Sequence, residues 1–472
     1  MRKFARTISG VTPVAVMTAP RECPGHCVYC PTYAVTPQSY TPESPAVLRA
    51  RLCGYDTGEQ IRLRLKALAE MGHPIDKIEL IIMGGTFLAA PEDYQYRFIK
   101  ECYDALNGSA APTLAEAKQR NETAPCRCTG LCIETRPDWC GEAEVARMLE
   151  FGATRVELGV QTLSDDIYRL VRRGHTVADV FTATRRLKER GFKVYYHWMP
   201  GLPGMTPEAD LAMFSRLFTD EGLRPDGLKI YPTMVIEGTE LAEWHRAGRY
   251  QPYAADVMLN LIAEMKALVP GYVRLARVVR DIPSKFITAG LRNSPRNLIR
   301  ERLREKGLSC RCIRCREYGH RLREGAEIGV PALKRMDYEA SGGREVFLSF
   351  EDEGETLFGL LRLRLQRQPV IAGAPSAGEH AVIRELHVFG PEVPIRERKP
   401  KTAQHRGLGR ALVAEAERIA AAESGAGQIA VLSGVGAREY YRDSGYRACG
   451  DYMVKDFINP ARRDAVSFSA IP

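Results

Sequence analysis

Short runs of β-branched and aromatic residues recur between residues 13 and 280, and amphipathic stretches lie between them. Two of those stretches, 61–72 and 180–191, end at a glycine, where a helix C-cap is expected. Strands that alternate with helices build parallel βα units. The sequence therefore predicts an α/β fold with a partial or full parallel barrel, whose functional groups follow the strand C-termini. The strand-like runs are 13–18, 77–83, 131–137, 154–160, 193–199, 228–233 and 272–278.

This rhythm stops near residue 280, and the pattern changes again near residue 340. At 472 residues the chain exceeds the ~250–300 that one core usually serves. From 340 onwards, "REVFLSFED" and "TLFGLLRLRLQ" indicate an antiparallel pair, and "AVIRELHVFG" indicates a further strand. We therefore expect three parts, namely a βα domain at 1–280, a linker at 281–339 and a second α/β domain at 340–472.

Three cysteines follow the first predicted strand in "CPGHCVYC". Cys23, Cys27 and Cys30 have C-x3-C-x2-C spacing, so their thiolates can hold three corners of an iron–sulfur cubane. No fourth cysteine is nearby, which leaves one iron open to another ligand. The alternative is a zinc site that uses His26 as its fourth ligand.

The cysteine loop and the motifs after it resemble the radical S-adenosylmethionine enzymes over roughly residues 1–280. The resemblance implies that the cysteine loop holds a [4Fe-4S] cluster, with all three cysteines counted as catalytic. S-Adenosylmethionine would bind its open iron, and one electron from a donor would release an adenosyl radical. The resemblance also implies that S-adenosylmethionine contacts Tyr29 before the last cysteine, Gly84 and Gly85 in "MGGTF", Glu134 in "IETRPD" (which also contains Arg136) and Gln161 in "LGVQT".

Residues 404–409, "QHRGLG", open a predicted helix in the last part of the chain. Glycine-rich helix N-termini expose backbone N–H groups that can bind a pyrophosphate. Together with "IRELHVF" before it and "SGVGAREYYRDSGY" after it, this motif resembles the GNAT acetyltransferases. That implies an acetyl-CoA site with Tyr441 as a catalytic residue near the thioester sulfur. Its other expected residues are Glu385, Leu386, His387, Val388, Gln404, Gly407, Leu408, Gly409 and Arg410.

A radical barrel followed by a GNAT domain resembles the family of Elongator catalytic subunits and their stand-alone prokaryotic counterparts. The resemblance implies an enzyme that builds a carboxymethyl group on C5 of the wobble uridine, in the anticodon loop of tRNA, from acetyl-CoA. The adenosyl radical would activate the acetyl methyl group, Lys77 would contact acetyl-CoA, and other Elongator subunits would be partners where they exist. Two alternatives stay open: a protein lysine acetyltransferase with a vestigial radical domain, and a non-enzymatic tRNA-binding platform.

Positive charge is concentrated in residues 270–335, which hold 17 Lys or Arg against 6 Asp or Glu, whereas the whole chain has a net charge of +9. Such density favours a phosphate-binding surface, although a solvated basic helix is the plain alternative.

Cys310, Cys312 and Cys315 lie inside this segment. Zinc, with either His320 or a cysteine from elsewhere as its fourth ligand, would order a linker with little apolar material. A second iron–sulfur cluster and free thiols are the alternatives. The residues expected to bind tRNA are Arg274, Arg277, Arg280, Lys285, Arg292, Arg296 and Arg300.

The cysteine pattern also bears on compartment. The 13 cysteines fall in short groups rather than in a disulfide framework, which indicates cytosolic thiols and metal ligands. No run approaches the ~18 apolar residues of a membrane span, so we expect a cytoplasmic protein without a membrane partner. Cys126, Cys128 and Cys132 receive no assignment from the sequence, and they could be bystanders, a source of a zinc ligand or part of an auxiliary site.

Overall fold

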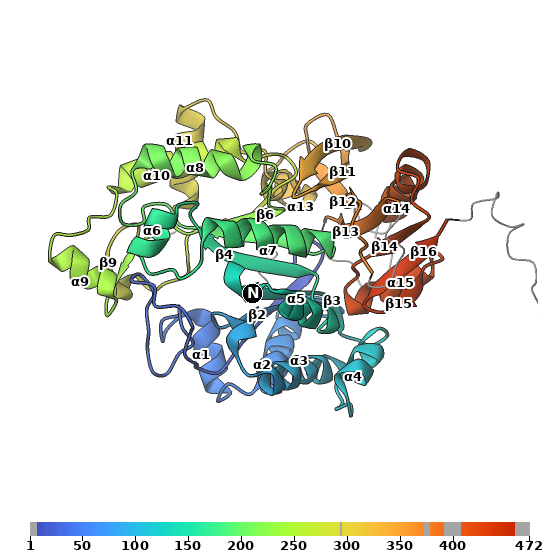
Figure 1. The fold of residues 1–472 in the computed structure, drawn as a ribbon, viewed down its shortest axis with the longest axis horizontal. Coiled ribbons are helices and arrows are strands. Elements are labelled where there is room, and N and C mark those ends of the chain that lie inside the picture. The colour runs from blue at the N-terminus through green and yellow to red at the C-terminus, as the bar shows by residue number, and fades with distance from the viewer. Residues whose placement is uncertain (1–6, 293–294, 372–377, 391–406, 458–472) are drawn as a thin grey trace, which may run out of the picture.

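The computed structural model describes residues 7–292, 295–371, 378–390 and 407–457. Its first sheet has seven strands in the order β1-β2-β3-β4-β5-β6-β8, and every neighbouring pair is parallel. Figure 1 labels β2, β3, β4 and β6 of this sheet, together with the helices around it. The two end strands, β1 and β8, do not pair, so the sheet is a partial barrel, as expected. The strands are β1 (Thr12–Met17), β2 (Lys77–Met83), β3 (Arg127–Thr135), β4 (Arg155–Gln161), β5 (Lys193–Trp198), β6 (Gly227–Ile230) and β8 (Arg274–Val278).

Helices connect these strands, as the predicted alternation requires. Both predicted helix ends are confirmed, because Gly72 (φ 77°) and Gly191 (φ 86°) adopt the left-handed conformation just after α2 and α7. The helices of this part are α1 (Pro45–Leu52), α2 (Thr57–Glu70), α3 (Glu92–Asn107), α4 (Leu114–Asn121), α5 (Glu142–Glu150), α6 (Asp165–Leu170), α7 (Val177–Glu189), α8 (Pro207–Thr219), α9 (Glu240–Arg246) and α10 (Ala255–Leu268).

Side chains alternate along the barrel strands between an apolar face and a polar one. On β5, Val194, Tyr196 and Trp198 are buried in the main core, whereas Lys193 and His197 line an internal cavity. β4 alternates in the same way, with its polar side chains on the cavity side. The partial barrel therefore has a hydrophobic outer layer under its helices and a charged lumen.

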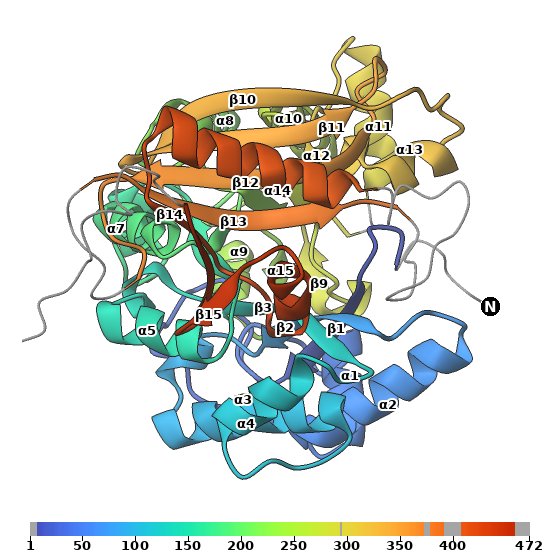
Figure 2. The same ribbon diagram turned by 90° about the vertical axis from the view of Figure 1, so that its right-hand side faces the viewer.

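The second sheet is mixed, in the order β10-β11-β12-β13-β14-β16-β15, and α14 packs across it (Figure 2). The predicted antiparallel pair is present as β11 and β12, and the predicted later strand is β13. The elements are β10 (Ala332–Ala340), β11 (Gly343–Glu351), β12 (Leu357–Gln366), β13 (His380–Val388), α14 (Leu408–Arg418), β14 (Gln428–Val431), α15 (Arg438–Arg442), β15 (Arg447–Cys449) and β16 (Tyr452–Asp456).

β13 carries a β-bulge. Arg362 on β12 pairs with Glu385, and the next residue, Leu363, pairs with Ile383, so Arg384 has no partner of its own. The parallel pairing of β13 with β14 extends only to Ile383, opposite Val431. Beyond that point β13 continues for several residues, paired only with β12.

The segment between the two sheets is less solvated than the sequence suggested. It contains α11 (Arg296–Glu305), α12 (Ile313–Arg316), α13 (Tyr318–Arg323) and β9 (Ile287–Ala289), which pairs with β7 (Val235–Ile236). Ile299 and Leu303 are buried in the main core, since four-residue spacing puts both on one face of α11. β10 begins within 281–339 and pairs with β11 along its whole length, so the second sheet takes in the end of that range.

Buried ion pairs join the two sheets. Arg384 Nη1 and Nη2 donate to the Asp226 carboxylate at 2.8 and 2.7 Å, and Arg384 Nη2 also reaches Glu345 at 2.7 Å. Arg364 meets the other oxygen of Glu345 at 3.0 Å. Arg362 donates to Glu385 at 2.8 Å. The three arginines are at most 1% exposed, so the carboxylates of both domains must stay in place to balance them.

Among the described residues, no helix combines the length and the apolar character needed to cross a bilayer.

Replacing Arg384 by Met should destabilise the protein by about 3–5 kcal/mol, because Asp226 and Glu345 would lose a buried partner while the volume is largely kept. The measurement is the thermal unfolding midpoint of the purified chain. Arg367→Met is the matched control, since Arg367 is an exposed arginine next to β12. Equal midpoints for the two variants would contradict the role assigned to this ion-pair network.

Candidate functional site

A cavity of about 850 Å³ runs through the lumen of the partial barrel. Cys23, Cys27 and Cys30, which follow the C-terminal end of β1, line this cavity. Glu385 and His387 of β13 line it too, and His387 contacts Ser9, which lies before the N-terminal end of β1. Its lining contains eleven Lys or Arg side chains and five Asp or Glu. Residues that the sequence assigned to two different cofactor sites therefore line the same cavity.

Each sulfur of the first cysteine loop meets one side-chain hydrogen-bonding group. Arg173 Nη1 donates to Cys27 Sγ at 3.5 Å, and Gln38 Nε2 donates to Cys30 Sγ at 3.6 Å. Cys23 Sγ lies 3.7 Å from Thr86 Oγ1. The loop itself is anchored through Val28, whose N–H donates to Val171 and whose carbonyl accepts from Leu241. Free thiols with donors in place fit a cluster that is bound by three thiolates.

Sulfur spacing separates the two cysteine groups. The Sγ atoms of Cys310, Cys312 and Cys315 all lie within 4.8 Å of one another, whereas the Cys23 loop forms no such group. One zinc ion at ~2.3 Å from each thiolate needs sulfurs about 3.8 Å apart. The second group therefore suits a single ion, and the wider first group suits a multi-iron cluster better than zinc.

His320 is not part of the second cysteine group. Burial lowers the pKa of His320 to about 4, so its imidazole is neutral at pH 7. The nearest side-chain cation is Lys266, whose Nζ lies 4.0 Å from Cys315 Sγ. The described residues thus bring together three ligands and an ammonium group, without the histidine that the sequence suggested as a possible ligand.

The glycines after β2 form a turn that other residues would strain. Gly84 has φ 137° and Gly85 has φ 85°. A Cβ on Gly84 would lie 1.9 Å from Thr18 Oγ1. Gly85 lines the main cavity, and Gly84 lines an adjoining pocket of 290 Å³ that Cys23 also borders. The turn therefore places exposed backbone next to the cysteine loop.

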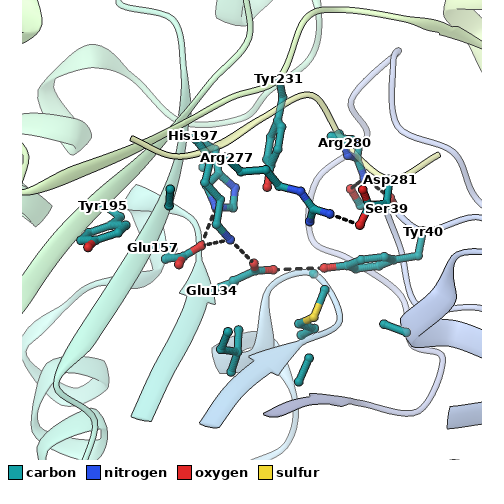
Figure 3. A pocket seen from close by; sticks show the side chains of 18 of the residues that line it. Ser39, Tyr40, Glu134, Glu157, Tyr195, His197, Tyr231, Arg277, Arg280 and Asp281 are labelled. Carbon is teal, nitrogen blue, oxygen red and sulfur yellow. Dashed lines mark hydrogen bonds and ion pairs between the residues drawn. The ribbon is translucent and has the colours of Figure 1, made fainter. Parts of the chain in front are cut away.

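A belt of paired charges crosses the middle of the lumen (Figure 3). Glu134 accepts from Tyr40 at 3.1 Å and from Lys229 at 3.1 Å. Lys229 also pairs with Glu157, which lies 2.9 Å from His197 Nε2. Although burial opposes ionisation, Lys229 and the His197 hydrogen bond hold the pKa of Glu157 well below its usual range. The two carboxylates and the imidazole could bind a metal by their spacing, but Lys229 already occupies the position of the cation.

Gln161, at the end of β4, combines two unusual features. Its backbone has φ 71°, and its Oε1 atom is buried without a hydrogen-bond partner among the described residues. Gln161 lines the main cavity. An unsatisfied acceptor at a cavity wall is a position where a ligand donor would be stabilised.

The second half of β13 divides its side chains between two faces. Glu385 and His387 face the lumen, where His387 Nε2 donates to the Ser9 carbonyl at 2.6 Å. Burial opposes ionisation of Glu385, but Lys193 and Arg362 lower its pKa to about 2. Leu386 packs on the opposite side, against the α14 core. Val388 lies on that side too, 3.7 Å from a Cβ built on Gly409.

The predicted glycine-rich helix start is present. Gly407 caps α14 in the left-handed conformation (φ 86°), and Leu408, Gly409 and Arg410 form its first turn. Gln404 lies outside the described residues. Tyr441 is 5% exposed and packs within the core of the second domain. The neighbouring Tyr440 lies closer to the helix start, because a Cβ atom added to Gly409 would be 3.0 Å from the Tyr440 hydroxyl.

Four of the predicted tRNA-binding residues, Arg274, Arg277, Arg280 and Arg296, line the cavity. The other three, Lys285, Arg292 and Arg300, are exposed outside it.

Lys77 opens β2 two residues before Glu79, which lines the cavity, although Lys77 does not.

Cys128 and Cys132 are buried in β3, and with Cys126 they form no metal-ligating group among the described residues.

Sequence reasoning missed Arg155, Arg173, Lys193, His197 and Lys229, all of which line the cavity. The signal that could have found four of them is the alternation of polar and apolar residues in "RVELGVQ", "KVYYHW" and "GLKI". Arg173 lies on a loop, where no periodicity marks it.

Comparisons with known proteins agree with this geometry. The model of the radical SAM superfamily matches residues 17–216, and a radical SAM C-terminal domain matches 225–306. A tRNA uridine(34) acetyltransferase from Dehalococcoides mccartyi is 60% identical over 96% of this chain and 99% of its own length. Human Elongator complex protein 3 is 43% identical over 96% of this chain and 85% of its own length. The structure of archaeal Elp3 from Methanocaldococcus infernus, with its N-terminus deleted, is 45% identical with a TM-score of 0.85, and the match covers 96% of this chain and 100% of that one.

Gly84→Ala should destabilise the turn after β2 by at least about 1–3 kcal/mol, because it combines backbone strain with a clash against Thr18. Thermal unfolding measures the loss. Gly427→Ala is the control, since a Cβ there meets no atom within 4 Å. A Gly84 variant as stable as this control would mean that the turn does not need glycine.

Proposed function

Because the chain belongs to the family of the tRNA uridine(34) acetyltransferases and Elongator complex proteins 3, we propose that it is a tRNA carboxymethyluridine synthase. In the proposed reaction the acetyl methyl group would lose a hydrogen atom to the adenosyl radical, and its carbon would bond to C5 of the wobble uridine, which would then lose its C5 proton and one electron, so that the electron first supplied by the donor is recovered. Hydrolysis of the thioester would free CoA and leave the carboxymethyl group. One observation carries this proposal: a single cavity connects the cysteine loop with β13 of the second domain. A radical that forms at the loop and an acetyl group held at β13 can therefore meet without leaving the protein.

The radical SAM domain implies a [4Fe-4S] cluster and S-adenosylmethionine. In the proposal Cys23, Cys27 and Cys30 hold the cluster, and an external donor supplies the electron. The cluster and S-adenosylmethionine together supply an adenosyl radical. Gly84, Gly85, Glu134 and Gln161, with Tyr29, bind S-adenosylmethionine. The unpaired Gln161 Oε1 supports this placement, whereas Glu134 must share its oxygens with Tyr40 and Lys229.

Acetyl-CoA is proposed to bind where β13 and β14 separate. Beyond Ile383, β13 pairs only with β12, so its other edge offers backbone groups to a pantetheine chain. The N-terminus of α14 lies alongside and favours the pyrophosphate. Glu385 and His387 of the same strand line the cavity, so the acetyl end of the molecule would reach the lumen beside them. Tyr441 and Lys77 remain proposed acetyl-CoA contacts.

The anticodon loop is proposed to enter from the side of Arg277, Arg280 and Arg296, which line the cavity. The excess of cationic side chains there suits a phosphate backbone that leads one base inward. The exposed Lys285, Arg292 and Arg300 would extend this track outside. Other Elongator subunits are proposed partners wherever they exist. A protein lysine acetyltransferase is not favoured, because such an enzyme has no need for the cysteine loop or the charged lumen.

The decisive measurement is nucleoside analysis of tRNA after incubation with anaerobically reconstituted protein, S-adenosylmethionine, a reductant and acetyl-CoA. We expect 5-carboxymethyluridine. Cys27→Ser should abolish the cleavage of S-adenosylmethionine by more than 100-fold while acetyl-CoA binding is retained, because the loop and β13 lie apart in the cavity. Acetylated protein lysine without modified uridine would favour the alternative enzyme, and continued cleavage by Cys27→Ser would refute the cluster ligands.

Zinc is proposed at Cys310, Cys312 and Cys315. We expect one zinc ion per purified chain by elemental analysis, and its loss in Cys312→Ser together with weaker tRNA binding at fixed salt, because α11 and its arginines would lose their anchor. Cys53→Ser, at a cysteine outside both groups, should keep the metal. Full zinc content in the Cys312 variant would count against this site.

A further inference from the structure

Only one of the donors that contact the first cysteine loop carries a charge. Gln38 and Thr86 are neutral, whereas the donor to Cys27 Sγ is the guanidinium of Arg173. Arginine remains protonated in proteins. Arg173 is 7% exposed, so little water screens its field at the sulfur.

Arg173 has no carboxylate within 4.0 Å among the described residues, which sets it apart from the other buried arginines of this region. Arg136 pairs with Asp138, and Arg155 pairs with Glu79 and Glu157. The Nε atom of Arg173 is buried and has no hydrogen-bond partner in the described structure. A buried charge without a counter-ion is costly. Of the two groups that Arg173 contacts through its Nη atoms, the Gly159 carbonyl and the Cys27 sulfur, only the sulfur can carry a full negative charge.

The position of this guanidinium is fixed by the backbone of β4. Nη2 of Arg173 donates to the Gly159 carbonyl at 2.6 Å. Gly159 leaves room for this contact, since a Cβ there would lie 2.4 Å from Nη2. With one Nη atom on the strand and the other on the thiolate, the fork of the guanidinium spans from β4 to the cysteine loop.

We propose that Arg173 is the internal counter-ion of the iron–sulfur cluster and raises its reduction potential, which makes the cluster easier to reduce. This rests on the proposed function, because it takes the Cys23 loop as the cluster site. The reduced cluster carries one more negative charge than the oxidised one, so a nearby buried cation stabilises the reduced form more. Net charge and hydrogen bonds to the sulfurs are known determinants of cluster potential. Arg173 is thus a positioning residue that acts through Cys27.

The test is a potentiometric titration, followed by electron paramagnetic resonance, of the full chain with its cluster reconstituted and S-adenosylmethionine omitted. Arg173→Gln should move the midpoint potential to more negative values. Arg173→Lys should move it the same way by less, because an ammonium keeps the charge but cannot donate to Cys27 and Gly159 together. Arg172→Gln is the matched control: Arg172 is exposed and pairs with Glu240, so its loss should leave the potential unchanged.

A wild-type potential in Arg173→Gln would overturn the inference while leaving the proposed function intact. If the glutamine variant does not retain a cluster, Arg173→Met takes its place, because it also removes the charge, and a wild-type potential there has the same meaning. Iron and sulfide analysis of the wild-type protein distinguishes failure of the proposed function from failure of this inference. If the wild-type chain holds no cluster at all, the proposed function falls and this inference falls with it.

Discussion

The paired charges of Arg384, Asp226 and Glu345 hold the two sheets of this protein together. Asp226 belongs to the barrel and precedes β6, whereas Arg384 and Glu345 belong to the second sheet. An apolar contact of the same size would tolerate small sliding, but a buried fork between carboxylates has only one satisfied arrangement. Because β13 carries both Arg384 and the residues that face the lumen, the same contact also sets the shape of the cavity.

The lumen depends on a second constraint, which is that a partial barrel is not closed by its own strands. Closed barrels of this size fill their interiors with branched apolar side chains. Here the inward positions of β4, β5 and β6 carry Arg155, His197 and Lys229, and all three contact the carboxylate of Glu157 on the lumen wall. The first domain therefore contains a cavity lined by polar side chains, and the second domain covers one side of that cavity.

Much of this could be predicted from the sequence. Local patterns predicted the strands, the helix ends at Gly72 and Gly191, and the order of the motifs, because these depend on near neighbours in the chain. The sequence also indicated both cysteine groups. It could not indicate that their sulfurs differ in spacing, because that depends on loop conformation. Arg173 was missed for the same reason: its partners Cys27 and Gly159 are distant in the sequence. The linker is more buried than its composition predicted. It contains few apolar residues, but Ile299 and Leu303 lie on one face of α11 and pack into the main core.

The bulge on β13 has a consequence for the phase of that strand. Before it, Val382 and Arg384 point towards the barrel; after it, Glu385 and His387 do. One inserted residue thus shifts the alternation by half a period, so that the charge anchoring the domains and the side chains facing the lumen lie on the same side. Without that residue, a regular strand would turn Glu385 and His387 towards α14 and present Leu386 to the cavity. The cavity is polar on the wall formed by β13 because this strand contains one extra residue at its bulge.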